Sequence, residues 1–294
     1  MPGVRRSAML GVLVLLALAA NCRSEHSRPR AKIVRDAPGG TAPAMSGVAF
    51  SKDGSCWGLA RRSLEVIAID PPCTVAPPKN LPAFTEFVRV SPGLDALAYT
   101  TDRYKTVVTT DIEGAREVRR FSTTGDVGVN GLAVSSKYVA YAVGDDVRWR
   151  DRVIVAERAT GRVIATREYS LAAKNVAMSF AEIRKRACLA ISQKNEVEVI
   201  CGLGESSNSV WHFKTRDFLF PLQSVALGRD GIAFSGRTAG HFLCPWNGKC
   251  ARLPTNGAMY ESADMTFSSD GAFLADVNQG SGYAVLYELE SDKP

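Results

Sequence analysis

The stretch VAFSKDG, from Val48 to Gly54, decides the fold because weakened copies of it return along the rest of the chain. The unit reads as a short apolar run, then Ser or Gly, then a turn rich in Asp, Gly and Pro, then a second apolar run. This order is typical of two antiparallel strands joined by a tight turn. The further copies are VRVSPGL from Val88, LAVSSKY from Leu132, VAMSFAE from Val176, VALGRDG from Val225 and MTFSSDG from Met265.

The unit resembles the repeat of TolB-type β-propellers, which are related to the WD-repeat proteins, over residues 46 to 289. Successive copies begin 40 to 49 residues apart, and a blade of four strands needs about 40 to 50 residues. Seven blades would leave only about 35 residues each, which is below that range. The sequence therefore predicts one all-β domain over residues 46–294, a six-bladed β-propeller of four-stranded antiparallel blades.

Residues 1–21 have the pattern of a signal peptide. A basic start, MPGVRR, precedes an uncharged apolar run of 13 residues from Ala8 to Ala20. Secretory apolar regions run about 7 to 15 residues, whereas a membrane-spanning helix needs about 20. The run ends in LALAANC, which resembles the lipobox of bacterial lipoproteins and makes Cys22 the candidate lipidation site. Asn21 departs from the Gly, Ala or Ser that the family prefers there, and the preceding ALA triplet also suits ordinary signal peptidase.

These features predict an exported protein. Lipidation would anchor it to a membrane, facing the periplasm or the cell surface, and cleavage without lipidation would leave it soluble in the periplasm. Residues 22–45 are polar and basic, with too little apolar surface to offset the entropy lost on ordering. They predict a partly disordered tether.

One β-prone stretch in the tether, from Ala31 to Asp36, has a candidate partner at the other end of the chain. The last blade lacks a fourth strand, since only five residues follow Leu289. An unpaired third strand would leave backbone donors and acceptors without partners along an apolar edge. We therefore expect Ala31 to Asp36 to pair beside Tyr283 to Leu289 and close the ring. The alternative is a tether that is disordered throughout.

Cysteine usage agrees with export, because six cysteines remain after Cys22, an even number that suits disulfides in an oxidising compartment. Reduced, buried cysteines in a cytosolic protein are the alternative. Folding ACLAIS against EVEVIC about the Lys194-Asn195 turn places two cysteines directly opposite each other. In CPWNGKC, a three-residue loop does the same. The predicted disulfides are Cys56–Cys73, Cys188–Cys201 and Cys244–Cys250.

The net charge of +6 raises the question of nucleic-acid binding. Basic residues cluster in RWRDR, residues 148–152, and in RKR, residues 184–186. Aspartate interrupts the first cluster, the second reads as a turn between strands, and an exported protein rarely meets DNA. We expect no nucleic-acid partner, and a weak attraction to anionic lipid headgroups or wall polymers instead.

Motifs for catalysis are absent from the sequence. It contains no HExxH, no phosphate-binding glycine loop, no GxSxG and no CxxC. The three histidines, His26, His212 and His241, are scattered over the tether and separate blades. Asp145, Asp146 and Asp151 offer oxygen ligands for a hard cation, but they fall where a hairpin turn is expected. The sequence therefore predicts no catalytic residue, no metal and no cofactor.

One polar constellation depends on the fold. In propellers the first strand of each blade lines the central channel, so the residues just before each repeat gather at one mouth. Here all of them are polar. They form either a funnel that binds a small ligand or a peptide end, or simply the wet end of a channel. The candidates are Ser46, Glu86, Asn130, Lys174, Asn175, Gln223, Ser224 and Asp264.

Two functions follow. The first is a monomeric, non-enzymatic scaffold in the cell envelope that binds a protein partner or a small ligand, as the resemblance to TolB-type propellers suggests. The second is an enzyme similar to the propeller lactone hydrolases, dehydrogenases or lyases, with Glu86 and Asp264 as acid and base. Such enzymes generally hold a metal or a cofactor, so metal analysis and an absorbance spectrum would separate the two.

Overall fold

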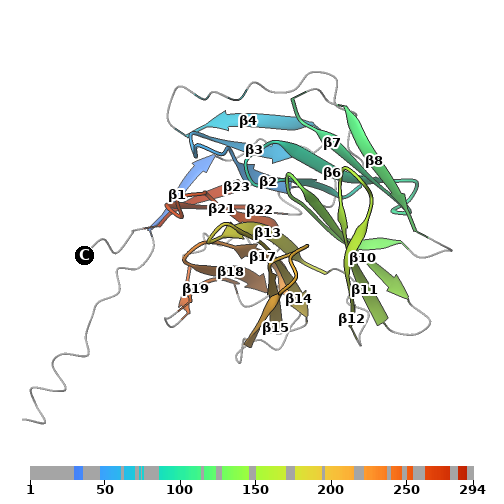
Figure 1. Cartoon of the computed structure of the whole chain (residues 1–294). Helices are drawn as coiled ribbons and strands as arrows, with labels where there is room; N and C mark the ends of the chain where they lie inside the picture. The colour runs from blue at the N-terminus through green and yellow to red at the C-terminus, as the bar shows by residue number, and fades with distance from the viewer. Residues whose placement is uncertain are drawn as a thin grey trace, which may run out of the picture. The chain divides into compact units, whose positions relative to one another are not determined.

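The part of the chain that the structure describes contains 23 β-strands and no helix (Figure 1). In this computed structural model, that part comprises the backbone of residues 30–35 and residues 47–60, 63–69, 73, 75, 86–113, 116–123, 128–145, 150–169, 176–193, 196–214, 222–236, 240–246, 250–253, 262–278 and 284–289. The predicted signal peptide and Cys22 lie outside it. Nowhere in these ranges is there a helix long and apolar enough to cross a membrane.

The strands form six antiparallel sheets, called blades 1 to 6 in chain order. Blade 1 contains β2 (Gly47–Phe50), β3 (Cys56–Ala60) and β4 (Leu64–Ala68); blade 2 contains β5 (Val88–Val90), β6 (Ala96–Thr101), β7 (Thr106–Asp111) and β8 (Glu117–Ser122); blade 3 contains β9 (Val129–Val134), β10 (Tyr138–Asp145), β11 (Arg150–Glu157) and β12 (Val163–Tyr169). Blade 4 contains β13 (Met178–Ile183), β14 (Arg186–Gln193), β15 (Glu196–Cys201) and β16 (Ser209–Lys214); blade 5 contains β17 (Leu222–Leu227), β18 (Gly231–Gly236), β19 (Gly240–Pro245) and β20 (Ala251–Arg252); blade 6 contains β21 (Ser262–Phe267), β22 (Phe273–Asn278), β23 (Ala284–Glu288) and β1 (Arg30–Arg35).

The first strand of each blade contacts the first strand of the next, and the sixth returns to the first. These contacts run from β2 through β5, β9, β13, β17 and β21 back to β2. Six sheets joined in this way make a closed ring, so the predicted six-bladed propeller is confirmed. Blade 1 shows three strands within the described residues, and residues 76–85, where a fourth would fall, lie outside them.

The repeated serine closes the first turn of several blades. Ser51 Oγ accepts a hydrogen bond from the Cys56 N–H at 3.0 Å and donates one to Asp53 Oδ1 at 2.6 Å. Ser268 does the same in blade 6, with the Phe273 N–H at 2.9 Å and Asp270 Oδ1 at 2.6 Å. A hydroxyl can donate and accept at once, so one residue type satisfies the turn.

Blade 4 departs from the predicted frame. The sequence places the first turn directly after Ser179, but β13 continues to Ile183 and turns at Arg184 and Lys185, whose φ angles are 51° and 64°. Ser179 Oγ instead accepts a hydrogen bond from the Leu227 N–H of blade 5, at 3.3 Å. The repeat alone therefore misplaces this turn, whereas the expectation that the segment RKR, residues 184–186, forms a turn between strands is confirmed.

The apolar residues form six buried clusters, one between each pair of neighbouring blades. Strand β2 shows why, because successive side chains of a strand point to opposite faces. Val48 packs toward blade 6 and Ala49 toward blade 2. Both faces of each blade are thus buried, and the repeats read as nearly continuous apolar runs rather than as alternating ones.

All three predicted disulfides are present: Cys56–Cys73, Cys188–Cys201 and Cys244–Cys250. The register predicted for blade 4 is also confirmed, since Gln193 pairs with Glu196 and Cys188 with Cys201. Each disulfide joins residues of a single blade. They therefore fasten strands within blades and leave the closure of the ring to other contacts.

The N-terminal strand β1 closes blade 6. It runs antiparallel to β23, with Arg30 opposite Glu288 and Lys32 opposite Leu286, and the register shifts between Lys32 and Arg35 (Figure 1). The predicted closure by a strand from the tether is confirmed. It gives β23 a backbone partner on the side that would otherwise be an open edge.

Candidate functional site

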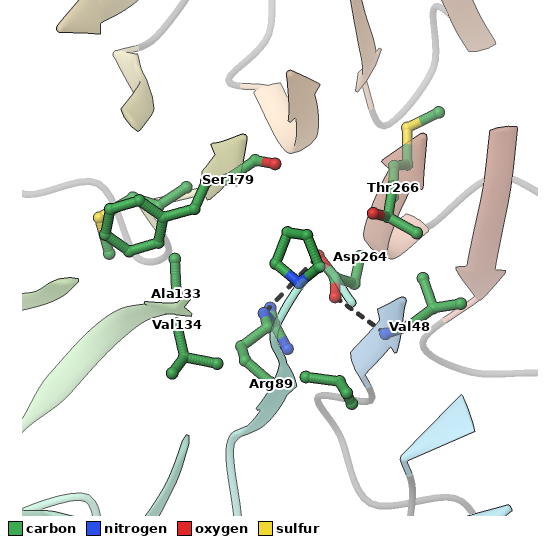
Figure 2. A pocket seen from close by; sticks show the side chains of 12 residues that line it. Val48, Arg89, Ala133, Val134, Ser179, Asp264 and Thr266 are labelled. Atoms are coloured by element: carbon green, nitrogen blue, oxygen red, sulfur yellow. Dashed lines mark hydrogen bonds and ion pairs between the residues drawn. The ribbon is translucent and has the colours of Figure 1, made fainter. Parts of the chain in front are cut away.

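The second position of the repeat contributes three residues to the central cavity: Arg89, Ala133 and Thr266. Four of the six copies have alanine at that position, at Ala49, Ala133, Ala177 and Ala226, MTFS has Thr266 and VRVS has Arg89. The Arg89 side chain extends into the cavity (Figure 2).

Glycine lets the first strands approach closely around this centre. A Cβ atom added at Gly131 would lie 2.4 Å from the carbonyl oxygen of Val176 on blade 4. One added at Gly47 would lie 2.8 Å from both the Arg89 Cα and the Val88 carbonyl oxygen of blade 2. Contacts this short are not available to any side chain, so these two glycines set the spacing of the blades.

The cavity at the centre leaves about 20 Å³ for the centres of water-sized molecules. This is room for about one water molecule, well below what a typical organic ligand needs. Figure 2 shows Arg89 and Asp264 pointing toward one another across it. The lining comes from five blades: Val48, Arg89, Val90, Pro92, Ala133, Val134, Met178, Ser179, Phe180, Asp264, Met265 and Thr266.

Asp264 is the buried acid of this cavity. Its Oδ2 accepts a hydrogen bond from the Val48 N–H at 3.0 Å, and its Oδ1 lies 3.7 Å from Arg89 Nε. Burial raises the pKa of Asp264 from its usual 3.8 to about 6. The Arg89 charge and the N–H groups of Val48 and Met265 act in the opposite direction and limit the rise.

The Arg89 guanidinium is held by carbonyl groups of its own blade and of blade 6, and by the Asp264 carboxylate. Nη1 donates to the carbonyl of Val88 at 2.9 Å, and Nη2 donates to the carbonyl of Ala263 at 3.0 Å. With the ion pair to Asp264, this links blade 2 to blade 6, while the Val48 bond adds blade 1. The pair therefore fastens the ring at its axis.

Glu86, the other predicted acid, is placed in a turn of blade 2 and does not line the cavity. Its two carboxylate oxygens accept hydrogen bonds from the N–H groups of Arg103 and Tyr104, at 2.9 and 2.8 Å. Asp102, Arg103 and Tyr104 all have positive φ, from 58° to 65°, which is costly for residues with side chains. Glu86 thus stabilises a strained turn.

For the remaining candidates the structure gives individual contacts, and their gathering at one mouth stays a prediction. Asn130 donates from Nδ2 to Asp151 Oδ1 at 2.8 Å. The Oε1 atom of Gln223 is buried and has no hydrogen-bond partner there. Ser224 is buried between blades 5 and 6. Ser46, Lys174 and Asn175 lie outside the described residues.

Ser224 belongs to a buried polar network between blades 5 and 6. Its hydroxyl lies 2.6 Å from that of Ser262, which donates to Asp276. Asp276 Oδ2 lies 3.2 Å from His241 Nε2, and His241 Nδ1 lies 3.3 Å from the Tyr287 hydroxyl. Burial raises the pKa of Asp276, and His241 and Ser262 oppose that rise. The groups come from blades 5 and 6 and are almost fully buried. The network therefore joins these two blades and is closed to solvent.

The sequence analysis did not single out two buried charged residues, Arg89 and Asp276, although each stands out in its sequence context. Arg89 is a charged residue at a repeat position otherwise occupied by alanine or threonine. Asp276 is an acid inside the apolar strand FLADVN and is completely buried. Buried charges are kept only where they have partners, so each of these residues predicts a partner, although not which one.

Comparisons with known proteins agree on the fold alone. No family model matches the sequence, and no curated protein matches it either. Among solved structures, the β-propeller domain of Myceliophteria thermophila Cps50 (Swd1) is 10% identical, with a TM-score of 0.59, over 89% of this chain and 100% of that one. Kuenenia stuttgartiensis hydrazine synthase is 14% identical, with a TM-score of 0.55, over 84% of each chain. KlAtg21, in a complex with the coiled-coil of AgAtg16, is 11% identical, with a TM-score of 0.52, over 84% of this chain and 81% of that one.

These likenesses establish a WD-like β-propeller and leave its activity open. One neighbour is named as an enzyme and another as a partner in a protein complex. The described residues contain no group of three or more His, Cys, Asp or Glu side chains placed to hold a metal ion.

Proposed function

We propose that this protein is an exported, lipid-anchored β-propeller that serves as a non-enzymatic binding scaffold in the cell envelope. Residues 1–21 are the signal peptide, Cys22 carries the lipid, residues 22–45 form the tether and residues 46–294 form the propeller. The partner is an envelope protein, with a small ligand at the channel as the alternative occupant.

The observation that carries this proposal is the use to which the acidic candidates are put. Asp264 is bonded to Val48 and Arg89, and Glu86 to the backbone of a strained turn. Asp264 thus joins blades, and Glu86 stabilises a turn within blade 2. A ring whose acids serve its own structure offers mainly its outer surface for recognition, and in one structural neighbour a propeller of this kind is found with a coiled-coil.

Crosslinking in the native membrane, followed by purification of the full chain, tests the binding role. A partner that crosslinks in stoichiometric amount, and that binds the purified chain again, supports the proposal. If no partner is recovered and the purified chain turns over a substrate, the proposal is wrong.

The anchor is tested separately by Cys22→Ala. We expect this variant to lose metabolic labelling with fatty acid and to move from the membrane to the soluble fraction, because the thioether is the only attachment proposed. Persistent labelling would place the lipid elsewhere, and absence of labelling in the wild type would leave a soluble periplasmic scaffold.

A second function, catalysis at the channel, is favoured by one observation. An acid with a pKa of about 6 in a solvent-connected cavity is well matched to proton transfer near neutral pH. If the protein is a hydrolase, dehydrogenase or lyase, Asp264→Asn will abolish turnover while partner binding persists. Metal analysis and an absorbance spectrum of the wild type add a readout that does not depend on knowing the substrate.

A further inference from the structure

Strand β16 forms the outer edge of blade 4. It pairs with β15 along its whole length, with Trp211 opposite Val199 and Val210 opposite Ile200. Within the described residues no strand pairs with its other side. Every second N–H and C=O group on that side is therefore directed away from the sheet, ready to pair with another strand.

Three other outer strands, β8, β12 and β20, carry features that discourage such pairing, and β16 does not. Strand β8, EVRRFS, has Arg119 and Arg120 at its centre, and β12, VIATREY, has an arginine and a glutamate. Strand β20 has only two residues. In β16, SVWHFK, the one lysine or arginine is Lys214 at the end. Charges and short length are the usual protection of a sheet edge.

Apolar side chains are exposed on both faces of β16. Val210 is 39% exposed and Trp211 48% exposed, and the other exposed large apolar residue in the described part of the chain is Val163. Their partners show that they face opposite ways, since Ile200 packs between blades 3 and 4 and Val199 between blades 4 and 5. The Trp211 ring lies 6.4 Å from that of Trp246 in blade 5.

We propose that two copies of this chain associate edge to edge through β16, in an antiparallel pair about a two-fold axis. Such a pair brings the same patch of each copy together. Residues directly opposite each other in an antiparallel pair lie on the same face of the sheet, so the axis passes through a residue. With the axis at Trp211, the two Trp211 residues lie opposite each other. Val210 then lies opposite His212, and Ser209 lies opposite Phe213.

The charges of β16 fit this pairing. No lysine or arginine opposes another, because the two Lys214 side chains lie at opposite ends of the pair. His212 already has an acidic neighbour, with Nδ1 2.9 Å from Glu196 Oε1. In β8, an axis at either central residue would set Arg119 against Arg119 or Arg120 against Arg120, and like charges directly opposite are destabilising. The charges of β16 therefore allow a self-pairing that those of β8 oppose.

This inference replaces the monomer expected from the sequence, and it does not depend on the proposed function. A dimer of this kind leaves the channel and the N-terminal anchor uninvolved. Its failure would leave the scaffold proposal intact, and a missing envelope partner would say nothing about β16.

Sedimentation of the purified full chain in detergent, over a wide range of protein concentration, measures the association. We expect a reversible dimer in the wild type. Trp211→Lys should weaken it by about tenfold or more, because it puts an unpaired charge at the centre of the contact. Val163→Lys is the matched control, since it adds the same charge at an even more exposed position of β12, and should leave the dimer unchanged.

Amide hydrogen exchange supplies a readout without mutation. Exchange in β16 should slow as concentration rises, while exchange in β8 and β12 should not change. A wild type that remains a monomer at all concentrations would overturn the proposal, and so would a dimer that Trp211→Lys and Val163→Lys weaken equally. Occupation of the edge by residues 215–221 of the same chain would appear as slow exchange in β16 that is independent of concentration, which also overturns it.

Discussion

At the scale of single residues, one arginine determines what the centre of the ring can be. The cavity there is lined by residues of five blades, and Arg89 fills part of it with a charge. A buried charge is tolerated only when it is paired and hydrogen-bonded. Arg89 meets that condition with two carbonyl groups and Asp264.

The ion pair predicts how stability depends on pH. The folded-state pKa of Asp264, about 6, lies above its usual 3.8, so the folded protein binds the proton more tightly than the unfolded chain does. The contribution of Asp264 to stability is therefore greatest below about pH 4 and falls as pH rises toward 6. Above pH 6 the carboxylate is charged and depends on Arg89.

Arg89→Leu removes that partner. We expect a loss of about 3–5 kcal/mol at pH 8, where a buried carboxylate is left unpaired, and a clearly smaller loss at pH 5, where Asp264 takes up a proton. Denaturant unfolding at the two pH values measures the difference. Arg120→Leu is the control, since the Arg120–Glu117 pair is largely exposed and exposed pairs contribute little. Equal losses at pH 5 and pH 8 would contradict the role given to the pair.

Residue chemistry could be predicted from the sequence only in part. The position of Arg89 in the repeat marks it as unusual, and the apolar surroundings of Asp276 mark that residue as well. Their partners could not be predicted, because Asp264 is far from Arg89 in the chain and His241 is on another blade. The expectation for Glu86 rested on its position just before a repeat, which places it at a channel mouth. Its hydrogen bonds are instead made with a turn in the left-handed conformation.

At the scale of elements, the strand most open to experiment is β1. It contributes the backbone partner of β23 and occupies a position that would otherwise expose an edge. It is also the only strand of its blade that comes from the opposite end of the chain. Its removal should therefore affect the ring and not only its own segment.

Deleting residues 31–36 should lower the melting temperature by several degrees. The lost backbone bonds and apolar contacts amount to a few kcal/mol, and each kcal/mol shifts the melting temperature by about 2–4 °C in a chain of this size. Deleting residues 23–28 removes six residues of the tether and keeps β1, so it should leave the melting temperature unchanged. If both deletions have the same effect, β1 does not close the ring.

Elements were predicted well where a local turn fixes the register. The pairing of Cys188 with Cys201 follows from counting outward from one hairpin, and the structure has that register. The repeat misplaces the first turn of blade 4 for the opposite reason, although the basic segment at residues 184–186 was correctly expected to be a turn. There the repeat supplies a serine but no turn residues after it, and Ser179 is used by the neighbouring blade.

At the scale of the whole molecule, the disulfides and the ring closure do different work. The disulfides join residues separated by 17, 13 and 6 positions, each within one blade. Closure rests on contacts between distant segments, such as the bond between Val48 and Asp264, which are 216 residues apart. Stabilising a blade and closing the ring are thus separable.

Replacing Cys188 and Cys201 together by alanine should test this separation. Opening a loop of this length costs about 3 kcal/mol, so the melting temperature should fall. Unfolding should remain a single transition in calorimetry, because the contacts between blades are intact. Two resolved transitions would show that the disulfide holds the ring together as well as the blade.

The repeat made the number of blades and the origin of the closing strand predictable, since both follow from spacing and from counting strands. What gathers at the axis and what is exposed at the outer edge was less predictable. Arg89 with Asp264, and Trp211 with Trp246, come together only when separate blades are placed in space.

Closure by β1 also sets an order of events when the chain is made. A polypeptide is synthesised from its N-terminus, so β1 is among the first segments to emerge and β23 the last. Arg30 must wait for Glu288, about 260 residues later, before blade 6 can form, and contacts of such long range slow folding. Until then β1 and β22 both lack β23, the strand that lies between them in the sheet. A chain cut short before β23 leaves β1 without a partner, and incomplete products should be removed by proteases before they accumulate.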